Sequence, residues 1–261
     1  HYMSIADAGR LIRDGDLSPV DFVEALLTRI SQIDPKLDAF LAVTGEQARE
    51  DALEAQEEIA NGNYRGPMHG IPYGLKDIID YAGLKTTAHS KLLADNTADT
   101  DATVTAKLRA AGGVFMGKLA THEFAIGGPS FDLPWPPARN PWNTDRHPGG
   151  SSSGSGAAVA AGLLPGALGS DTGGSVRHPA SICSLAGIKP TYGRVSRAGV
   201  VPLSFSLDNV GPLTRTVEDN AIMLSIISGH DPRDPASARA EAEDFTRDID
   251  KGVKGLRIGL V

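Results

Sequence analysis

Three stretches of the sequence carry side chains that could perform chemistry, and the first surrounds Ser175. This serine directly follows Gly173 and Gly174 in the run Asp171-Thr172-Gly173-Gly174-Ser175-Val176-Arg177. Glycines let the backbone turn tightly and let a substrate approach it closely, so the hydroxyl should be exposed enough to attack. A developing oxyanion could be bound by the backbone N–H groups of Thr172, Gly173, Gly174 and Ser175. An inactive strand-to-helix turn explains this segment alone equally well.

The second stretch runs from Gly149 to Gly156, and every residue in it is glycine or serine. Such a composition is typical of a flexible linker, but apolar helix and strand patterns follow it without a polar break. A Gly/Ser loop that opens a buried helix presents N–H groups and hydroxyls, those of Ser151 and Ser152 among them, to one point. The competing interpretation is a phosphate loop, but the Lys-Ser/Thr ending of a P-loop is missing.

The third stretch places Lys76 inside the apolar run from Gly70 to Asp80, which predicts a buried strand. Most lysines are solvated surface charges. Removal of this amine from water would lower its pKa, so that a neutral amine could serve as a base near pH 7. This stretch alone therefore makes Lys76 a candidate base, with a solvated surface lysine as the commoner interpretation.

Histidine and metal chemistry have less support in the sequence. His122 and His178 lie near the glycine-rich loops, but neither has an obvious acidic residue nearby to orient it. A Ser-His-Asp triad that uses His178 is the mechanistic alternative. The segment around Ser175 lacks the Gly-x-Ser-x-Gly elbow of α/β-hydrolases. No His, Asp or Glu cluster has metal-ligand spacing, so no metal site is expected, and Cys183 is expected to be a small buried apolar residue.

The elements that must position these residues follow from the helix and strand patterns. Helices are expected over residues 3–14, 18–33, 45–60, 101–111 and 157–164. Besides the lysine strand, short buried strands are expected at 113–117 and 167–169, with a turn at 171–174. Strand and helix alternate, which indicates an α/β fold. Residues 255–261 have a strand pattern at the end of the sequence, so we expect the chain to be part of a longer one.

Composition and charge argue against several classes of protein. The 261 residues are 41% hydrophobic and 22% charged, which is ordinary globular composition, and the formal net charge is −7. Because there is no basic run, nucleic acid is not expected as a direct partner. Neither a membrane span nor a signal peptide is visible in the pattern, so no membrane association is expected. The single cysteine excludes an internal disulfide and fits a reducing cytoplasm.

Taken together, the motifs resemble the amidase signature family over about residues 18–230. Residues 70–77 resemble the lysine strand of that family, residues 149–152 its Gly-Gly-Ser-Ser loop, and residues 171–180 its nucleophile segment. Residues 187–193 and 206–212 continue the pattern, and the 24 positions from Ser151 to Ser175 match the spacing in the family. The resemblance implies one α/β/α domain, with a large mixed sheet covered by helices on both faces. In this chain the domain would span residues 3–261, with N-terminal helices at 3–60, a catalytic core at 66–230 and the start of a continuing part at 231–261.

The resemblance also implies a role for each residue. Ser175 would be the nucleophile that forms an acyl-enzyme, and Ser151, in a cis peptide after Gly150, would connect it to Lys76. Lys76 would start neutral, accept the proton through Ser151 and pass it to the leaving amine. Water would then hydrolyse the ester, and no cofactor is needed. Supporting roles would fall to Ser152, Asp171 and Arg177, and substrate contacts to Ala125, Ile126 and Ser151.

Two positions depart from the loop of the family. Ser153 stands where glycine is frequent, and Gly156 stands where alanine is frequent. If position 153 requires a positive φ, serine there costs on the order of 1 kcal/mol.

The leading hypothesis is a stand-alone hydrolase of a small amide, aryl amide or carbamate with an uncharged acyl group. The alternative is the glutaminase component, or A subunit, of a tRNA-dependent amidotransferase, which releases ammonia from glutamine while its partner handles the tRNA. His178, where that component typically has glutamine, and residues 202–208 favour the first hypothesis. A third hypothesis, a non-catalytic binding protein on the same fold, conflicts with the presence of all three candidate catalytic residues. A homodimer is common in the family.

Overall fold

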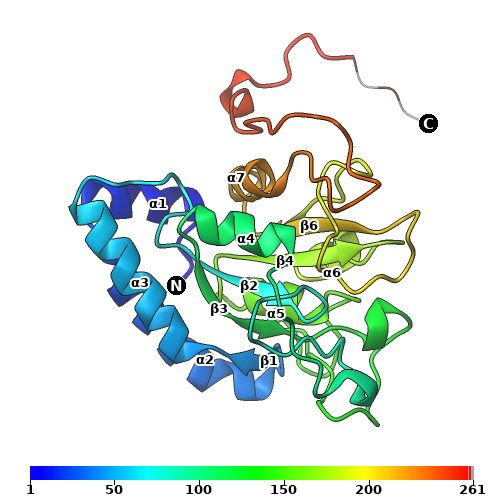
Figure 1. Ribbon diagram of the computed structural model, residues 1–261. Coiled ribbons are helices and arrows are strands. Elements are labelled where there is room, and N and C mark those ends of the chain that lie inside the picture. Colours follow the sequence, from blue (N-terminus) through cyan, green and yellow to red (C-terminus); the bar gives the residue numbers. More distant parts are fainter. Residues whose placement is uncertain (258, 260–261) are drawn as a thin grey trace.

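A mixed six-stranded sheet organises the computed structural model of the chain, which describes residues 1–257 and 259 (Figure 1). The strand order is β1-β3-β2-β4-β6-β5. Strand β2 runs parallel to both of its neighbours, β3 and β4, whereas β1, β6 and β5 join by antiparallel pairing. The strand bounds are β1 Phe40–Val43, β2 Pro72–Lys76, β3 Val114–Leu119, β4 Gly166–Asp171, β5 Ala186–Gly187 and β6 Asn209–Thr214.

Helices connect these strands and cover both faces of the sheet, as the sequence predicted. The α-helices of the described chain are α1 Ile5–Asp14, α2 Pro19–Ile33, α3 Gly45–Ala60, α4 Thr103–Ala110, α5 Ser153–Ala160, α6 Arg177–Ile182 and α7 Val217–Ile227. Short 3-10 helices lie at Asp34–Lys36, Lys91–Leu93, Glu123–Ala125 and Ile249–Lys251. None of the described helices is long and apolar enough to cross a bilayer.

Helix α2 begins where the sequence predicts it. The hydroxyl of Ser18 accepts a hydrogen bond from the N–H of Asp21 at 3.1 Å, and Pro19 occupies the first turn. The cap satisfies a backbone N–H that has no partner inside the helix, and proline suits a position where no N–H is required. Phe22, Leu26 and Ile30 then recur on one buried face. Local sequence therefore suffices to place this helix.

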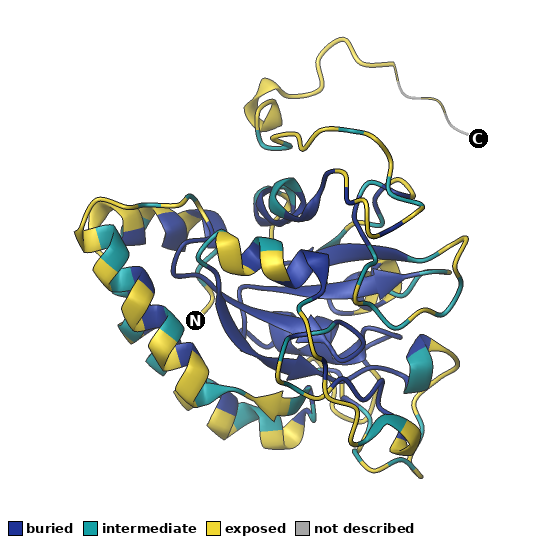
Figure 2. Cartoon of the chain, in the orientation of Figure 1, coloured by how far each residue is buried: buried dark blue, intermediate teal, exposed yellow. Residues whose placement is uncertain are grey.

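The central strands are buried because helices pack on both faces of the sheet. Every residue of β2, β3, β4 and β6 is buried (Figure 2). A Cβ added to Gly169 of β4 would meet Ser152, just before α5, at 2.5 Å. A Cβ added to Gly166 of the same strand would meet Met223 of α7 at 2.6 Å. Because side chains three positions apart on a strand point to opposite faces, α5 and α7 lie on opposite sides of the sheet.

Helix α5 starts earlier than the sequence predicts. Residues 157–164 were the expected helix, but α5 spans Ser153–Ala160 and includes the second half of the Gly/Ser run. A Cβ on Gly154 would overlap the backbone of Ala39 and Ala120, so only a helix of very small residues can approach so closely. Tertiary packing here overrides the low helix propensity of glycine and serine. The linker interpretation is wrong, and position 153 does not require a positive φ, because Ser153 is helical.

Other expectations hold with different bounds or fail. The lysine strand is limited to Pro72–Lys76, because the carbonyl of Lys76 accepts hydrogen bonds from the N–H groups of Ile78 and Ile79 in a turn. Strands β1, β5 and β6 were not predicted. The strand expected at 255–261 is not formed over residues 255–257, and residues 258, 260 and 261 of that prediction lie outside the described residues.

Candidate active site

Lys76 ends β2 with its amine inside the protein. Its Nζ lies 2.7 Å from Ser151 Oγ and 2.8 Å from Ser170 Oγ. The side chain is fully buried, and this burial lowers the pKa of the amine to about 7, although the carboxylates of Asp171 and Asp208 oppose the shift. At neutral pH about half of the amine is therefore uncharged and able to accept a proton.

Ser151 reaches Lys76 from the loop that precedes α5. The peptide bond between Gly150 and Ser151 is cis, as the resemblance implied. Ser151 is buried, and its carbonyl accepts a hydrogen bond from the N–H of His122 at 3.0 Å. The N–H of Ser152 donates to the carbonyl of Ser175 at 3.3 Å, so the two serine loops are adjacent. The structure thus brings together the lysine strand, the Gly/Ser loop and the nucleophile segment.

Ser175 lies in the turn after β4, half-buried, and its hydroxyl makes no hydrogen bond within the described chain. The N–H groups of Gly173 and Ser175 are likewise not used by any hydrogen bond among the described residues. The N–H of Gly174 donates to Asp171 Oδ1 at 2.8 Å. Gly174 is therefore unavailable for the predicted oxyanion hole, because its one donor already binds a buried carboxylate.

Asp171, the last residue of β4, holds the turn that carries Ser175. Its carboxylate accepts hydrogen bonds from the N–H groups of Gly174, Val176 and Arg177 and from two nitrogens of the Arg177 guanidinium. Burial by itself raises the pKa of Asp171, but the bonds from Arg177 outweigh it and the net pKa is lowered. Arg177 neutralises a buried carboxylate and fixes the turn, as expected for a bracing residue.

Ser152 and Thr172 tie the same turn to its surroundings. The hydroxyl of Ser152 bonds both the carbonyl and the N–H of Ser170 at 3.2 Å. The hydroxyl of Thr172 donates to Asp208 Oδ1 at 2.5 Å, and Asp208 also accepts from the N–H groups of Leu203 and Ser204. Asp208 therefore connects the turn after β4, which carries Ser175, to the loop at Leu203 and Ser204.

The structure does not support a triad through His178. Its Nδ1 lies 3.3 Å from the N and O atoms of Gly150, and no carboxylate of the described chain pairs with it. Within residues 1–257 and 259, no group of three or more His, Cys, Asp or Glu is placed to hold a metal ion. Cys183 is buried, which raises the pKa of its thiol to about 12.

A cavity of about 250 Å³ opens next to the lysine site. Its wall includes Ser170, the second partner of Lys76, and Ala125, one of the predicted substrate contacts. Ile126 does not line it and is 62% exposed, so the structure gives Ile126 no place in this cavity. The apolar part of the wall is formed by Ile78, Val200, Val201, Leu203 and Phe205.

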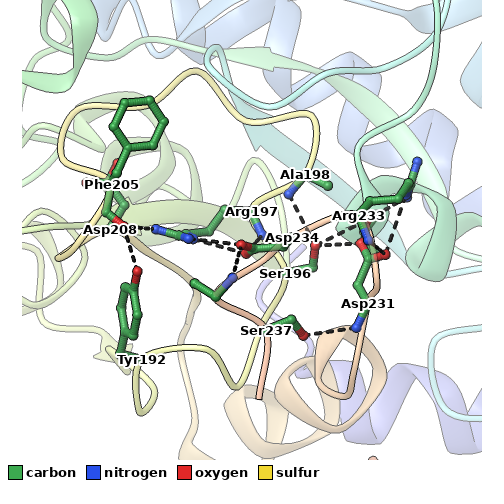
Figure 3. Close-up of polar contacts among 12 residues, drawn as sticks. Tyr192, Ser196, Arg197, Ala198, Phe205, Asp208, Asp231, Arg233, Asp234 and Ser237 are labelled. Atoms are coloured by element: carbon green, nitrogen blue, oxygen red, sulfur yellow. Dashed lines mark hydrogen bonds and ion pairs between the residues drawn. The ribbon is translucent and has the colours of Figure 1, made fainter. Parts of the chain in front are cut away.

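The two arginines at the edge of this cavity are paired with aspartates (Figure 3). Arg197 forms a two-point ion pair with Asp234, with distances of 2.9 and 3.0 Å, and donates to the carbonyl of Phe205. Asp231 accepts from Ser196 and lies 3.5 Å from Arg233. These pairs neutralise the arginines, while the carboxylate of Asp208 in the same wall accepts hydrogen bonds from uncharged donors.

Comparison with known proteins agrees with this geometry. Residues 21–261 match the family model described as Amidase. The chain belongs to the amidase family. The A subunit of the glutamyl-tRNA(Gln) amidotransferase of Roseiflexus castenholzii is 47% identical over 260 residues, which are 100% of this chain and 53% of that protein. The chain spans about half the length of the curated relatives it matches.

Solved structures similar to this amidase-family chain include two kinds of protein. The peptide amidase from Stenotrophomonas maltophilia has a TM-score of 0.90 and 36% identity, over 97% of this chain and 54% of that one. The A subunit of the glutamyl-tRNA(Gln) amidotransferase from Thermotoga maritima has a TM-score of 0.81 and 39% identity, over 97% and 52%. The α/β/α architecture predicted from the sequence is confirmed.

Sequence reasoning missed Ser170 and a second buried lysine of this amidase-family chain. Lys118 of β3 also sits in an apolar strand, the signal that singled out Lys76, but its Nζ lies 2.9 Å from the carboxylate of Asp77. Burial lowers the pKa of Lys118 while Asp77 raises it. The charged partner favours the protonated form, whereas the two direct partners of Lys76 are neutral hydroxyls. The chemistry of the partner therefore distinguishes a structural lysine from a candidate base.

Proposed function

We propose that this chain carries the catalytic serine machinery of an amide hydrolase, with Ser175 as nucleophile, Ser151 as proton relay and Lys76 as base. One observation carries the proposal: among the described residues, the fully buried amine of Lys76 contacts two hydroxyls and no carboxylate. A lysine that is buried without a charged partner is costly, and such costs are concentrated at functional sites. Membership of the amidase family supports the same assignment.

The reaction then follows from the positions of these groups. Neutral Lys76 takes the proton of Ser151 Oγ as Ser151 takes the proton of Ser175 Oγ, and the resulting alkoxide attacks the amide carbon. The unused N–H groups of Gly173 and Ser175 are the donors offered to the oxyanion. The lysine proton returns through Ser151 to the amine nitrogen, which leaves as the C–N bond breaks. Water, deprotonated by the same base, hydrolyses the Ser175 ester and releases the acid.

The cavity beside Ser170 supports an uncharged, largely apolar substrate group. Its wall is aliphatic and aromatic, and the arginines at its edge already have carboxylate partners. A substrate carboxylate would have to displace one of these pairs, at the cost of leaving an aspartate buried without a partner. We therefore expect amides with short alkyl or aryl acyl groups to react faster than analogues that end in a carboxylate.

A second candidate function is the glutamine-hydrolysing component of a tRNA-dependent amidotransferase. Relatives 45–47% identical over the whole chain are named as the A subunit of glutamyl-tRNA(Gln) amidotransferase. Both functions use the same Ser175 chemistry and differ in the acyl group and in the need for a partner protein. Glutamine hydrolysis that depends on a co-purified partner would favour this candidate over the stand-alone enzyme.

The test of the nucleophile and its base is intact mass spectrometry after reaction with a fluorophosphonate. We expect one adduct on the wild-type chain, none on Ser175→Ala, and slow formation on Lys76→Ala. Ser206→Ala is the matched control, because Ser206 is an exposed serine outside the cavity wall and should leave the adduct intact. Retention of the adduct in Ser175→Ala, or no adduct on the folded wild type, would refute the proposal.

A further inference from the structure

His122 joins the cavity wall to the loop that carries Ser151. Its backbone N–H donates to the carbonyl of Ser151 at 3.0 Å, and its Nδ1 lies 3.1 Å from the carbonyl of Gly127. Between these two contacts runs the segment that contains Ala125 of the cavity wall. His122 is 8% exposed, whereas Gly127 is exposed, so the contact with Gly127 is only partly shielded from water. One residue therefore holds the two parts of the site at a fixed separation.

The ring of His122 also packs directly on the peptide that leads into Ser151. Gly150 has no side chain, and a Cβ built there would overlap the Cε1 and Nε2 atoms of His122. The imidazole thus occupies the space that any other residue at position 150 would need. On its backbone atoms, Gly150 also contacts Nδ1 of His178. The relay serine is attached to a peptide that two imidazoles contact.

The hydrogen bond to Gly127 sets the state of the His122 ring. A carbonyl oxygen only accepts, so Nδ1 carries the proton and Nε2, which faces Gly150, does not. The pKa of His122 is lowered to about 4, chiefly by burial and less by the positive charges of Lys76, His147 and His178, while the hydrogen bond to Gly127 opposes the shift. The ring is neutral at the pH where Lys76 titrates and adds no charge beside the base.

We propose that His122 is a positioning residue for the reaction, whose ring and backbone hold the Gly150–Ser151 peptide so that Ser151 Oγ stays within hydrogen-bond distance of Lys76. This inference rests on the proposed function, because His122 would position Ser151, the proposed relay between Lys76 and Ser175. It differs from a general structural role in one respect. A positioning residue changes the rate of the chemical step in protein that is fully folded.

The rate of fluorophosphonate labelling in the full chain tests this role. We expect His122→Ala to lower the limiting labelling rate by about 10²-fold, because misplacement of a reacting group by about 1 Å costs that much. The probe concentration that gives half of the limiting rate should change little. His122→Asn keeps an N–H that can donate to Gly127, and should recover part of the rate. His230→Ala is the control, because His230 is exposed and lies outside the cavity wall.

The pH at which the labelling rate is half of its maximum provides a second measurement, which a loss of folded protein would not change. Removal of the ring admits water near Lys76, which weakens desolvation and raises the pKa of the amine. The rise of the labelling rate with pH should therefore shift to higher pH in His122→Ala. Partial unfolding would lower the rate equally at every pH and leave the midpoint in place.

A pair of glycine variants tests the contact itself. Gly150→Ala should lose labelling because its methyl group overlaps the imidazole, and Gly150→Ala with His122→Ala should label about tenfold faster than Gly150→Ala alone. If His122→Ala labels at the wild-type rate, or the double variant is no faster than Gly150→Ala, the inference is wrong while the proposed function stands. Failure of the wild type to label at all overturns the proposed function, and with it the role of His122.

Discussion

Replacement of Lys76 by methionine should slow labelling of the nucleophile and yet stabilise the protein at pH 6. The amine is fully buried, and its pKa falls from 10.5 to about 7 in the folded state. Between these two values the unfolded chain binds a proton that the folded chain does not. Stability therefore rises with pH across the window from about 7 to 10.5, and the buried lysine costs most below it.

The size of the effect follows from the shift and from the contacts of the amine. Each pKa unit corresponds to about 1.4 kcal/mol. The shift therefore lowers the free energy of unfolding by about 5 kcal/mol at pH 6 and by about 2 kcal/mol at pH 9. Methionine has a similar length but forfeits the hydrogen bonds to Ser151 and Ser170, together about 3 kcal/mol. Lys76→Met should thus be about 2 kcal/mol more stable than wild type at pH 6 and about 1 kcal/mol less stable at pH 9.

Urea unfolding followed by circular dichroism at the two pH values measures this difference. Lys118→Met is the matched control, because it removes an equally buried amine but leaves the Asp77 carboxylate without its partner. We expect it to destabilise the fold by about 3 kcal/mol or more at both pH values. A Lys76→Met protein less stable than wild type at pH 6, or with a gain independent of pH, would refute the idea that Lys76 is held as a neutral amine.

Three further predictions concern the same site. The labelling rate of the nucleophile should rise about tenfold per pH unit below about 7 and level off above, because only neutral Lys76 accepts a proton; a midpoint near 10 in rapid-mixing measurements would contradict this. Gly154→Ala should lower the free energy of unfolding, measured by urea titration, by about 3 kcal/mol, because the added methyl group overlaps backbone atoms packed on α5. The control Gly128→Ala has open space around it and should change that free energy by less than about 0.5 kcal/mol. Arg177→Met should cost about 2 kcal/mol and slow labelling, because Asp171 loses two side-chain hydrogen bonds; an unchanged midpoint in thermal unfolding would show that the pair does not brace the turn.

Where the structure departs from the sequence predictions, the three-dimensional surroundings of each residue decide the outcome. Propensity placed the start of the helix at residue 157, yet α5 begins at Ser153 because glycine and serine permit a close approach that larger residues forbid. Four N–H groups were candidates for the oxyanion hole, but the Asp171 carboxylate already holds that of Gly174. Ile126 was a predicted substrate contact, and its side chain instead faces solvent.

The sequence by itself determined which residues have the chemistry and where the chain turns. Ser175 after two glycines, Ser151 in a Gly/Ser loop and Lys76 in an apolar run are local patterns, and so is the capped start of α2. Only the tertiary structure decided that Lys76 meets Ser151 and Ser170, which lie 75 and 94 positions away along the chain. It also decided that Lys76 lacks a carboxylate partner while Lys118 has one. The pKa of a lysine depends on its burial and its partners, and both are set by strand pairing that no local pattern contains.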